Sequence, residues 1–393
     1  MRRHTWIVAC CCLVASGFVC AADIVIDQHQ PVVLSAPDPS QQTLLLGLHI
    51  NDRWQQLDLS QQADLTQRSR AGGSPDSAHY HGRVRGDTHS WVRLSWVDHA
   101  WQGGIFIGGE LMMLERRQRV SQLLSQPDRS HSRHLLFNVR DVRFITLIDP
   151  GGEHDSEHVG GHGDGHGDGH GSGFNGGELI GELQGDLPDP DLEVPLTMVV
   201  DSQFLDRYGG TATTEALARL NLLNGIFRQQ LGTGFHLLTL NLVSDNANMV
   251  DPHPSNLLHE FRDYMRFGPG SSIERIGVVN LLSGRDMTGG FVGSAWQGTV
   301  CQEHNHFSVN EDFGGMTLST LIMAHELGHN LNAPHDGTGA CSEEPFDGIM
   351  NAQINGTDQF SDCSISEMAL ELASASCLID TSETLFRSDF EFF

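Results

Sequence analysis

The sequence predicts an α/β domain built on one twisted, mixed sheet, preceded by a separate β-rich domain. Two observations support this prediction. Strand-like and helix-like patterns alternate across residues 193–380, which is typical of a sheet whose strands are joined by helices. Residues 23–150 show period-two alternation between turn residues, for example at 90–97, which is typical of strands alone.

The composition suits a globular protein and excludes two classes of partner. Hydrophobic residues make up 39% of the chain, and the net charge is −27. Nucleic acids and anionic membranes repel so acidic a chain, so we expect neither as a partner. We expect the protein to be a monomer.

The N-terminus is typical of a secretory signal peptide. A basic start at Arg2 and Arg3 is followed by an apolar stretch to about residue 20 and by the small residues Ala21 and Ala22. We therefore predict a signal peptide at 1–22 and a secreted protein, extracellular or, in a Gram-negative host, periplasmic. No later segment approaches the ~20 apolar residues that a membrane span needs.

A linker rich in Gly, His and Asp is predicted at 151–192. Its histidines recur every four residues, at 154, 158, 162, 166 and 170. Glycine at this density prevents a helix, so the spacing does not create a helical face. Two interpretations stay open, namely loose capture of a divalent metal and a flexible spacer between two domains.

The elements after the linker are predicted in order. We expect strands at 194–200, 235–243 and 276–282, and a Gly-rich strand at 290–298 that suits a sheet edge. One helix spans 213–231 and ends at Gly232, and a second is capped by Ser255 and ends at Gly268. The first helix has one predicted buried face, formed by Leu217, Leu220, Asn224, Phe227 and Leu231.

The run His325-Glu326-Leu327-Gly328-His329 carries the chemistry. The apolar stretch before it should be helical, which places residues i and i+4 on one face. Two imidazoles at this spacing can bind one zinc ion, and the carboxylate of Glu326 can reach a water beside the metal.

A third ligand is expected at His335. The chain should reverse at Asn332 in a left-handed conformation, and Pro334 stops the helix from continuing. Three neutral imidazoles leave a fourth position for water, as a catalytic zinc site requires. Zinc lowers the pKa of water towards ~7, and Glu326 would then take the proton as general base.

At these residues the sequence resembles the metzincins, and specifically the reprolysin (adamalysin, ADAM-type) metallopeptidases. The resemblance includes the extended run from His325 to Asp336 and the Gly348-Ile349-Met350-Asn351 segment, which is similar to the family's Met-turn. It implies a metzincin-like catalytic domain at 193–380 with a long zinc-binding helix, Met350 beneath the metal, and an edge strand that binds the substrate backbone.

The resemblance extends to both ends of the chain. The run from His81 to Asp87 is similar to the reprolysin propeptide, so 23–150 is predicted to be a β-rich propeptide domain of a zymogen. Sequence alone allows three pairings of the four cysteines that follow the signal peptide. The resemblance implies the disulfides Cys301–Cys377 and Cys341–Cys363.

The chain departs from the family in two respects. It has no Cys between residues 21 and 300, so a cysteine cannot hold the enzyme latent, and we hypothesise that His or Asp residues of the linker compete for the metal. Pro195 and Gly277 stand where acidic ligands of the family's structural calcium site are expected, which argues against calcium.

Together these features predict a secreted zinc metalloendopeptidase that acts on protein or peptide substrates with one catalytic Zn²⁺. The alternative is a His-rich zinc-binding or zinc-storing protein with a vestigial protease fold. Asp336 is expected to brace its loop, and His304 and His306 are expected to be solvated loop residues. The short tail at 381–393 is either a sorting tag or a disordered end.

Overall fold

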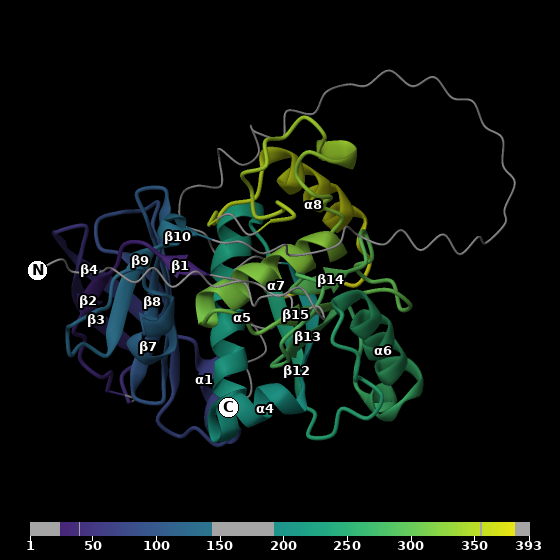
Figure 1. Cartoon of the computed structure of the whole chain (residues 1–393), viewed down its shortest axis with the longest axis horizontal. Helices are drawn as coiled ribbons and strands as arrows, with labels where there is room; N and C mark the ends of the chain where they lie inside the picture. The colour runs from purple at the N-terminus through teal and green to yellow at the C-terminus, as the bar shows by residue number, and fades with distance from the viewer. Residues whose placement is uncertain (1–23, 39, 144–191, 354–355, 382–393) are drawn as a thin grey trace, which may run out of the picture.

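The structure is a computed structural model, and it describes residues 24–38, 40–143, 192–353 and 356–381. The predicted signal peptide, the His-rich linker up to residue 191 and the tail beyond Thr381 lie outside the described residues. Figure 1 shows the N-terminal sheet on one side of helix α5 and the second sheet on the other. The long helix therefore lies between the two sheets.

The N-terminal part is β-rich, as predicted. Its elements are β1 (Val25–Ile26), β2 (Gln30–Val32), β3 (Thr43–Ile50), β4 (Arg53–Gln61), α1 (Ala63–Ala71), β5 (Ala78–Val84), β6 (Trp91–Val97), β7 (Ala100–Ile107), β8 (Glu110–Arg116), α2 (Arg117–Val120), β9 (His134–Asn138) and β10 (Val142–Arg143). Eight strands form one antiparallel sheet in the order β2-β9-β8-β7-β6-β5-β4-β3, and β1 pairs with β10.

The N-terminal sheet curls around an apolar core of its own. Side chains from one face, including Leu57, Leu94 and Trp101, form one buried cluster. The amide of Gln30 in β2 donates to the carbonyl of His49 in β3, so the two edge strands approach each other. The opposite face of the sheet is also apolar and packs on helices α5 and α7.

The second part is an α/β domain. Its elements are β11 (Leu192–Val200), α4 (Ser202–Tyr208), α5 (Ala212–Leu231), β12 (Gly234–Leu242), α6 (Pro254–Phe267), β13 (Val278–Ser283), β14 (Gly293–Ala295), β15 (Phe307–Glu311), α7 (Met316–Asn330), α8 (Asp362–Ser374) and β16 (Ile379–Asp380). Its main strand order is β12-β11-β13-β15-β14, with β16 beside β11. Strands β14 and β16 are antiparallel to their neighbours and the other pairs are parallel, so the sheet is mixed, as predicted.

Helices cover both faces of this sheet. Alternate side chains of the central strands pack on α5 and α7, and the intervening ones pack on α6. Helix α5 differs from its prediction, because residues 212–227 are buried all round rather than along one stripe. The second buried side faces the N-terminal sheet, which a helical repeat in the sequence cannot reveal.

Two boundaries were wrong at the level of local geometry. Helix α6 begins two residues earlier than expected, with Pro254 in its first turn and His253 as its N-cap, so Ser255 is not the cap. The Gly-rich strand is only three residues long, because the backbone has positive φ angles at Gly289, Gly290 and Gly298. It does lie at the sheet edge. Among the described helices, none is both long and apolar enough to cross a membrane.

Candidate metal centre

Helix α7 carries the central motif, as the sequence predicts. Its apolar residues place the helix between β15 and α5, and every residue from 316 to 330 is buried. His325 and His329 are one turn apart on this helix. Their side chains are 0% and 1% exposed, so the protein has removed both imidazoles from bulk water.

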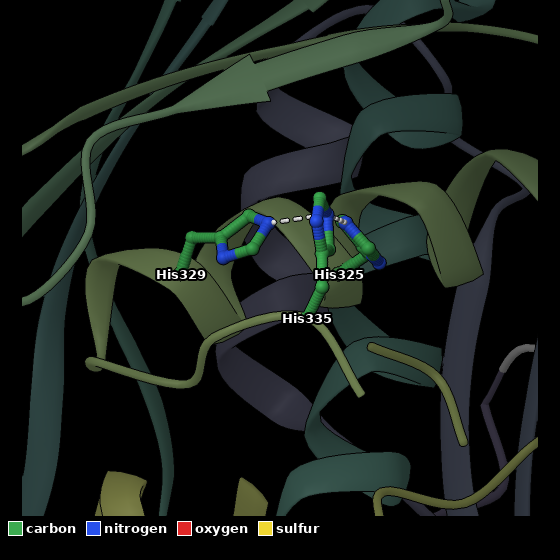
Figure 2. Close-up of side chains that lie close together, drawn as sticks. All are labelled: His325, His329 and His335. Carbon is green, nitrogen blue, oxygen red and sulfur yellow. Dashed lines mark hydrogen bonds between the residues drawn. The ribbon is translucent and has the colours of Figure 1, made fainter. Parts of the chain in front are cut away.

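The loop after α7 returns the third histidine to the first two. Asn332 has φ = +78°, which is the left-handed conformation that the sequence predicts for the reversal. Its backbone N–H donates to the carbonyl of His329, which closes the turn. Pro334 follows the turn, and the next residue, His335, turns its ring towards the helix (Figure 2).

Three ring nitrogens converge on one point. The Nε2 atoms of His325 and His335 are 3.2 Å apart, and those of His329 and His335 are also 3.2 Å apart. Nitrogens held at about 2.0–2.1 Å from one tetrahedral zinc ion lie roughly 3.3 Å from each other. The three donors therefore match the spacing of a zinc site, and they are the one such metal-ligand cluster among the residues that the structure describes.

Hydrogen bonds fix the orientation of two of the rings. The Nδ1–H group of His325 donates to the carbonyl of Ile349 at 2.7 Å, and that of His329 donates to the carbonyl of Ala333 at 2.8 Å. A neutral imidazole that donates through Nδ1 presents a lone pair at Nε2. Burial, helped by the neighbouring imidazoles, keeps the pKa of His325 well below its usual value. The donor set is thus prepared for a cation.

Glu326 lies between the helix and the edge of the sheet. Its side chain is fully buried, and a Cβ atom added to Gly293 would lie 2.2 Å from its Oε1 atom. The carboxylate therefore contacts the backbone of β14, where only glycine leaves room. Among the described residues, β14 has a strand partner on one side only, β15. The acid belongs to the helix that carries His325 and His329, and its carboxylate lies beside a strand at the edge of the sheet.

Met350 and Asp336 contact the segments that carry the three histidines. A Cβ atom on Gly328 would lie 2.6 Å from the Sδ atom of Met350, so this fully buried methionine packs directly under the helix turn between the first two histidines. Asp336 accepts hydrogen bonds from the backbone of Gly348 at 3.1 Å and from the hydroxyl of Ser361 at 2.7 Å. It braces the loop, which is the role expected for it.

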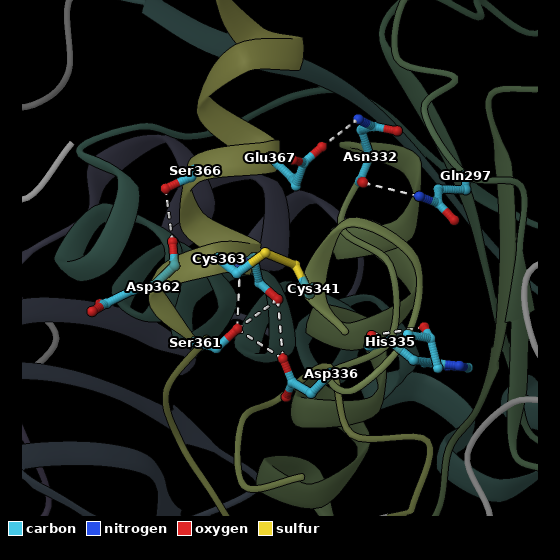
Figure 3. Close-up of a disulfide and its surroundings, with 12 residues drawn as sticks. Gln297, Asn332, His335, Asp336, Cys341, Ser361, Asp362, Cys363, Ser366 and Glu367 are labelled. Carbon is cyan, nitrogen blue, oxygen red and sulfur yellow. Dashed lines mark hydrogen bonds between the residues drawn. A yellow bond between two sulfur atoms is a disulfide. The ribbon is translucent and has the colours of Figure 1, made fainter. Parts of the chain in front are cut away.

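Two disulfides tie the loops of this domain together. The structure joins Cys301 to Cys377 and Cys341 to Cys363, which is the pairing that the resemblance implies. Figure 3 shows the second bridge between α8 and the loop that follows the third histidine. It thus holds in place the same segment that Asp336 braces.

Some features of the site could not be read from the sequence. His304 is exposed as expected, but His306 is buried, packs edge-on against Phe307 and has its pKa lowered to about 4 by burial. Only the glycine-rich composition of the edge segment hinted in the sequence at the contact between Gly293 and Glu326. The serine partners of Asp336 had none, because they lie about 25 residues away in the chain.

The sequence of this domain is similar to those of known proteins. The family model described as "Reprolysin (M12B) family zinc metalloprotease" matches residues 194–381. Human "A disintegrin and metalloproteinase with thrombospondin motifs 18" is 26% identical over 206 residues, which cover 48% of this chain and 17% of that protein. This chain therefore spans about a sixth of the length of that relative.

Two further relatives match the same domain. "Snake venom metalloproteinase atroxlysin-1" from Bothrops atrox is 29% identical over 186 residues, which cover 45% of this chain and 90% of the venom protein. Human "Disintegrin and metalloproteinase domain-containing protein 9" is 44% identical over 78 residues, 19% of this chain and 9% of that protein. Through residues 194–381, the chain is similar to the reprolysin (M12B) family of zinc metalloproteases.

Proposed function

We propose that the protein is a secreted zinc metalloendopeptidase. The observation that carries the proposal is the convergence of three Nε2 atoms at 3.2 Å spacings, two of them on rings oriented by backbone carbonyls. His325, His329 and His335 would hold one zinc ion. A zinc ion held in this way polarises a carbonyl and lowers the pKa of water towards ~7.

Glu326 is the residue to which we assign proton transfer. Its place beside His325 and against the edge strand puts it next to the substrate path that we propose. As general base it would accept the proton of the attacking water, and as general acid it would return that proton to the leaving amine.

The side of β14 that has no strand partner among the described residues is the proposed site for the substrate backbone. An extended peptide can add to an exposed sheet edge through main-chain hydrogen bonds, which hold any sequence in register. Bound in this way, a peptide would run past Glu326, because the carboxylate lies against Gly293 in the same strand. Protein or peptide chains are therefore the proposed substrates.

The location and domain boundaries are also proposals. The predicted signal peptide at 1–22 and the two disulfides suit an oxidising, exported environment. We assign 23–150 to a propeptide domain, 151–192 to a linker, 193–380 to the metallopeptidase domain and 381–393 to a tail.

Hydrolysis of casein by the full chain and by Glu326→Gln tests the proposal. General acid–base catalysis contributes ~10²–10⁴-fold, so we expect at least a hundredfold loss in the variant with its metal content unchanged. Exposed Glu303→Gln is the matched control and should retain full activity. A chelator should abolish cleavage, and added zinc should restore it.

Two results would count against the proposal. Equal cleavage by the wild type and Glu326→Gln would remove the assigned base. Zinc binding without any chelator-sensitive cleavage, even after removal of residues 23–190, would favour the alternative, a zinc-binding or zinc-storing protein, because a site that only holds metal has no need of Glu326.

A further inference from the structure

The contact between the N-terminal domain and helix α5 has a buried charge at its centre. Glu215 in α5 is fully buried, and its carboxylate accepts hydrogen bonds from Arg116 at 2.7 Å, Arg119 at 2.9 Å and Gln102 at 2.9 Å. All three donors belong to the N-terminal domain. Within α5, Arg219 lies 3.3 Å away and supplies one further contact. Most of the groups that compensate this buried carboxylate therefore come from the other domain.

The N-terminal domain also caps the helix that carries the metal ligands. Helix α7 begins after Gly315, whose lack of a side chain leaves the first turn without a local cap. Glu115 in β8 is 1% exposed, and its carboxylate accepts the backbone N–H of Thr317 at 2.7 Å. An N-cap side chain normally makes this bond. In return, Asp358 of the catalytic domain accepts the backbone N–H of Leu111 at 2.6 Å.

The two domains fit too closely for a loose contact. A Cβ atom on Gly225 in α5 would lie 2.6 Å from the ring of Trp91 in β6, so the helix backbone itself packs on the N-terminal sheet. One turn earlier, the amide of Asn221 donates to the carbonyls of Tyr80 and Leu94. Apolar packing and backbone hydrogen bonds are thus combined, as in the core of a single domain.

Removing the N-terminal domain would expose unsatisfied groups on the catalytic domain. Glu215 would lose three donors, and the first turn of α7 would lose its acceptor. Separation of the domains would break these hydrogen bonds and expose the apolar surface that Trp91 and helix α5 bury between them, and this loss opposes dissociation. The contact also differs from that of an inhibitor laid over the metal site. Eight residues separate Thr317 from His325, which corresponds to about 12 Å along the helix.

We propose that residues 24–143 form a permanent subunit of the peptidase, which stays bound when the chain is cut between the two domains. In this arrangement Glu115 is a positioning residue: it fixes the start of α7 and thereby the setting of the ligands further along the same helix. The proposal rests on the proposed function only for its catalytic readout, because association and metal binding can be measured without a substrate.

Cleavage of the full chain between the domains tests the association. A recognition sequence for a site-specific protease is placed after residue 165, the chain is cut, and the product is run on size-exclusion chromatography in native buffer. We expect both fragments in one peak at the mass of the uncut chain. Separation of the fragments, with the catalytic fragment still folded and active by itself, would overturn the proposal.

Two matched double variants connect the result to the buried charge. Arg116→Ala/Arg119→Ala removes two partners of Glu215 and should let the cut fragments separate, with an apparent dissociation constant at least about a hundredfold weaker. The control Arg53→Ala/Arg85→Ala removes two exposed arginines from the same domain and should elute as the wild type does. Equal elution of both double variants would contradict the role of the charge cluster.

Glu115 is tested by substitution in the uncut chain loaded with Co²⁺ alone, whose visible absorption reports the ligand geometry. Glu115→Ala should alter this spectrum and lower kcat about tenfold while leaving KM nearly unchanged. Glu115→Gln keeps an acceptor for Thr317 and should restore both. If the Ala and Gln variants give the same spectrum, Glu115 is not a positioning residue.

The outcomes separate this proposal from the proposed function. Fragments that co-elute and bind Co²⁺ but cleave no substrate would sink the peptidase assignment and leave the permanent subunit standing. Chelator-sensitive cleavage by a catalytic fragment that has separated from the N-terminal domain would do the opposite.

Discussion

At the scale of single residues, Asp336 shows how the third metal ligand is held. Its carboxylate accepts from a backbone N–H and from the hydroxyls of Ser361 and Ser364, and the side chain is fully buried. These bonds connect the residue next to His335 with the start of helix α8. Groups of this kind orient metal ligands and strengthen metal binding.

Asp336→Ala should therefore weaken zinc binding by about 10–100-fold. It should also lower the free energy of unfolding by roughly 2–4 kcal/mol, because three charge-assisted hydrogen bonds are lost. Metal titration with a chelator and urea unfolding measure the two effects. Asp286→Ala, at a side chain that is 98% exposed, is the control and should change neither quantity. Unchanged zinc affinity in Asp336→Ala would contradict the bracing role.

His79 makes stability depend on pH. It is fully buried between the hydroxyls of Ser69 and Ser95, at 2.6 and 2.8 Å, and burial lowers its pKa to about 3 although the charge of Glu215 opposes the shift. In the unfolded chain, His79 becomes protonated as the pH falls below ~6.5. In the folded chain, the same imidazole stays neutral down to about pH 3. Its contribution is complete above pH ~6.5 and is lost as the pH falls through this window.

Urea unfolding of the wild type and of His79→Gln at pH 7.5 and pH 5 measures this contribution. At pH 7.5 the wild type should have the larger free energy of unfolding. The difference between the two proteins should be roughly 2 kcal/mol smaller at pH 5. A difference between the two proteins that does not vary with pH would show that the imidazole is protonated in the folded state as readily as in the unfolded one.

Residue-scale prediction from the sequence succeeded where the chemistry is local. The spacing of His325 and His329 and the left-handed turn at Asn332 follow from helix geometry and backbone sterics, so both could be predicted. The burial of His306 could not, because it depends on Phe307 and on segments distant in the chain. A histidine in a polar run has the same local signature whether or not another segment covers it.

At the scale of elements, strand β14 and helix α7 meet through a glycine. The edge strand approaches the helix so closely at Gly293 that the carboxylate of Glu326 fills the space where a Cβ atom would be. Strand β14 pairs with β15 alone among the described residues, and its other side is the site that we propose for the substrate backbone. The proposed general base and the proposed substrate site therefore meet at a single helix–strand contact.

Gly293→Ala should displace the carboxylate, because the new Cβ atom would overlap Oε1. A shift of about 1 Å in a catalytic group can cost ~10²-fold, so kcat should fall between ten- and a hundredfold while zinc content stays at the wild-type level. Gly210→Ala, at a glycine with open space around it, is the matched control. Full peptidase activity in Gly293→Ala would show that Glu326 does not depend on this contact.

The elements themselves were predicted best where their periodicity is long. Helices α5 and α7 and strands β11 and β13 could all be placed to within about three residues from apolar patterns and Gly stops. The stripe predicted for α5 was incomplete, because a second sheet covers its other side. An apolar periodicity in the sequence indicates one buried face of a helix. Helix α5 lies between two sheets and therefore has two buried faces.

At the scale of the whole molecule, two disulfides reinforce the catalytic domain to different degrees. Cys301–Cys377 spans 76 residues and connects the segment after β14 to the C-terminal strand, whereas Cys341–Cys363 spans 22 residues and closes one loop. A longer loop loses more freedom in the unfolded chain when it is cross-linked, so the first bridge should stabilise more.

Replacing each pair by serines tests this order. The chain-entropy relation gives roughly 4.5 kcal/mol for Cys301→Ser/Cys377→Ser and roughly 3.4 kcal/mol for Cys341→Ser/Cys363→Ser. Denaturant unfolding of the two variants, each the control for the other, should place the first about 1 kcal/mol below the second. The reverse order would indicate that local strain or packing outweighs chain entropy.

The association of the two domains was beyond prediction from the sequence. Arg116 and Glu215 are about 100 residues apart and each has the local pattern of a solvated surface charge. Only the folded chain brings them together in a buried pair. The resemblance predicted a propeptide domain at 23–150, but it did not predict that this domain shares buried contacts with the catalytic domain.

The metal content of the purified protein tests the central claim most directly. Mass spectrometry of metals on the exchanged, chelator-free protein should give about one zinc ion per chain in the wild type and in Glu326→Gln. His329→Ala, which removes one of the three converging nitrogens, should contain almost none, and the exposed His304→Ala should match the wild type. Zinc retained at the wild-type level in His329→Ala would contradict the assignment of the metal to this centre.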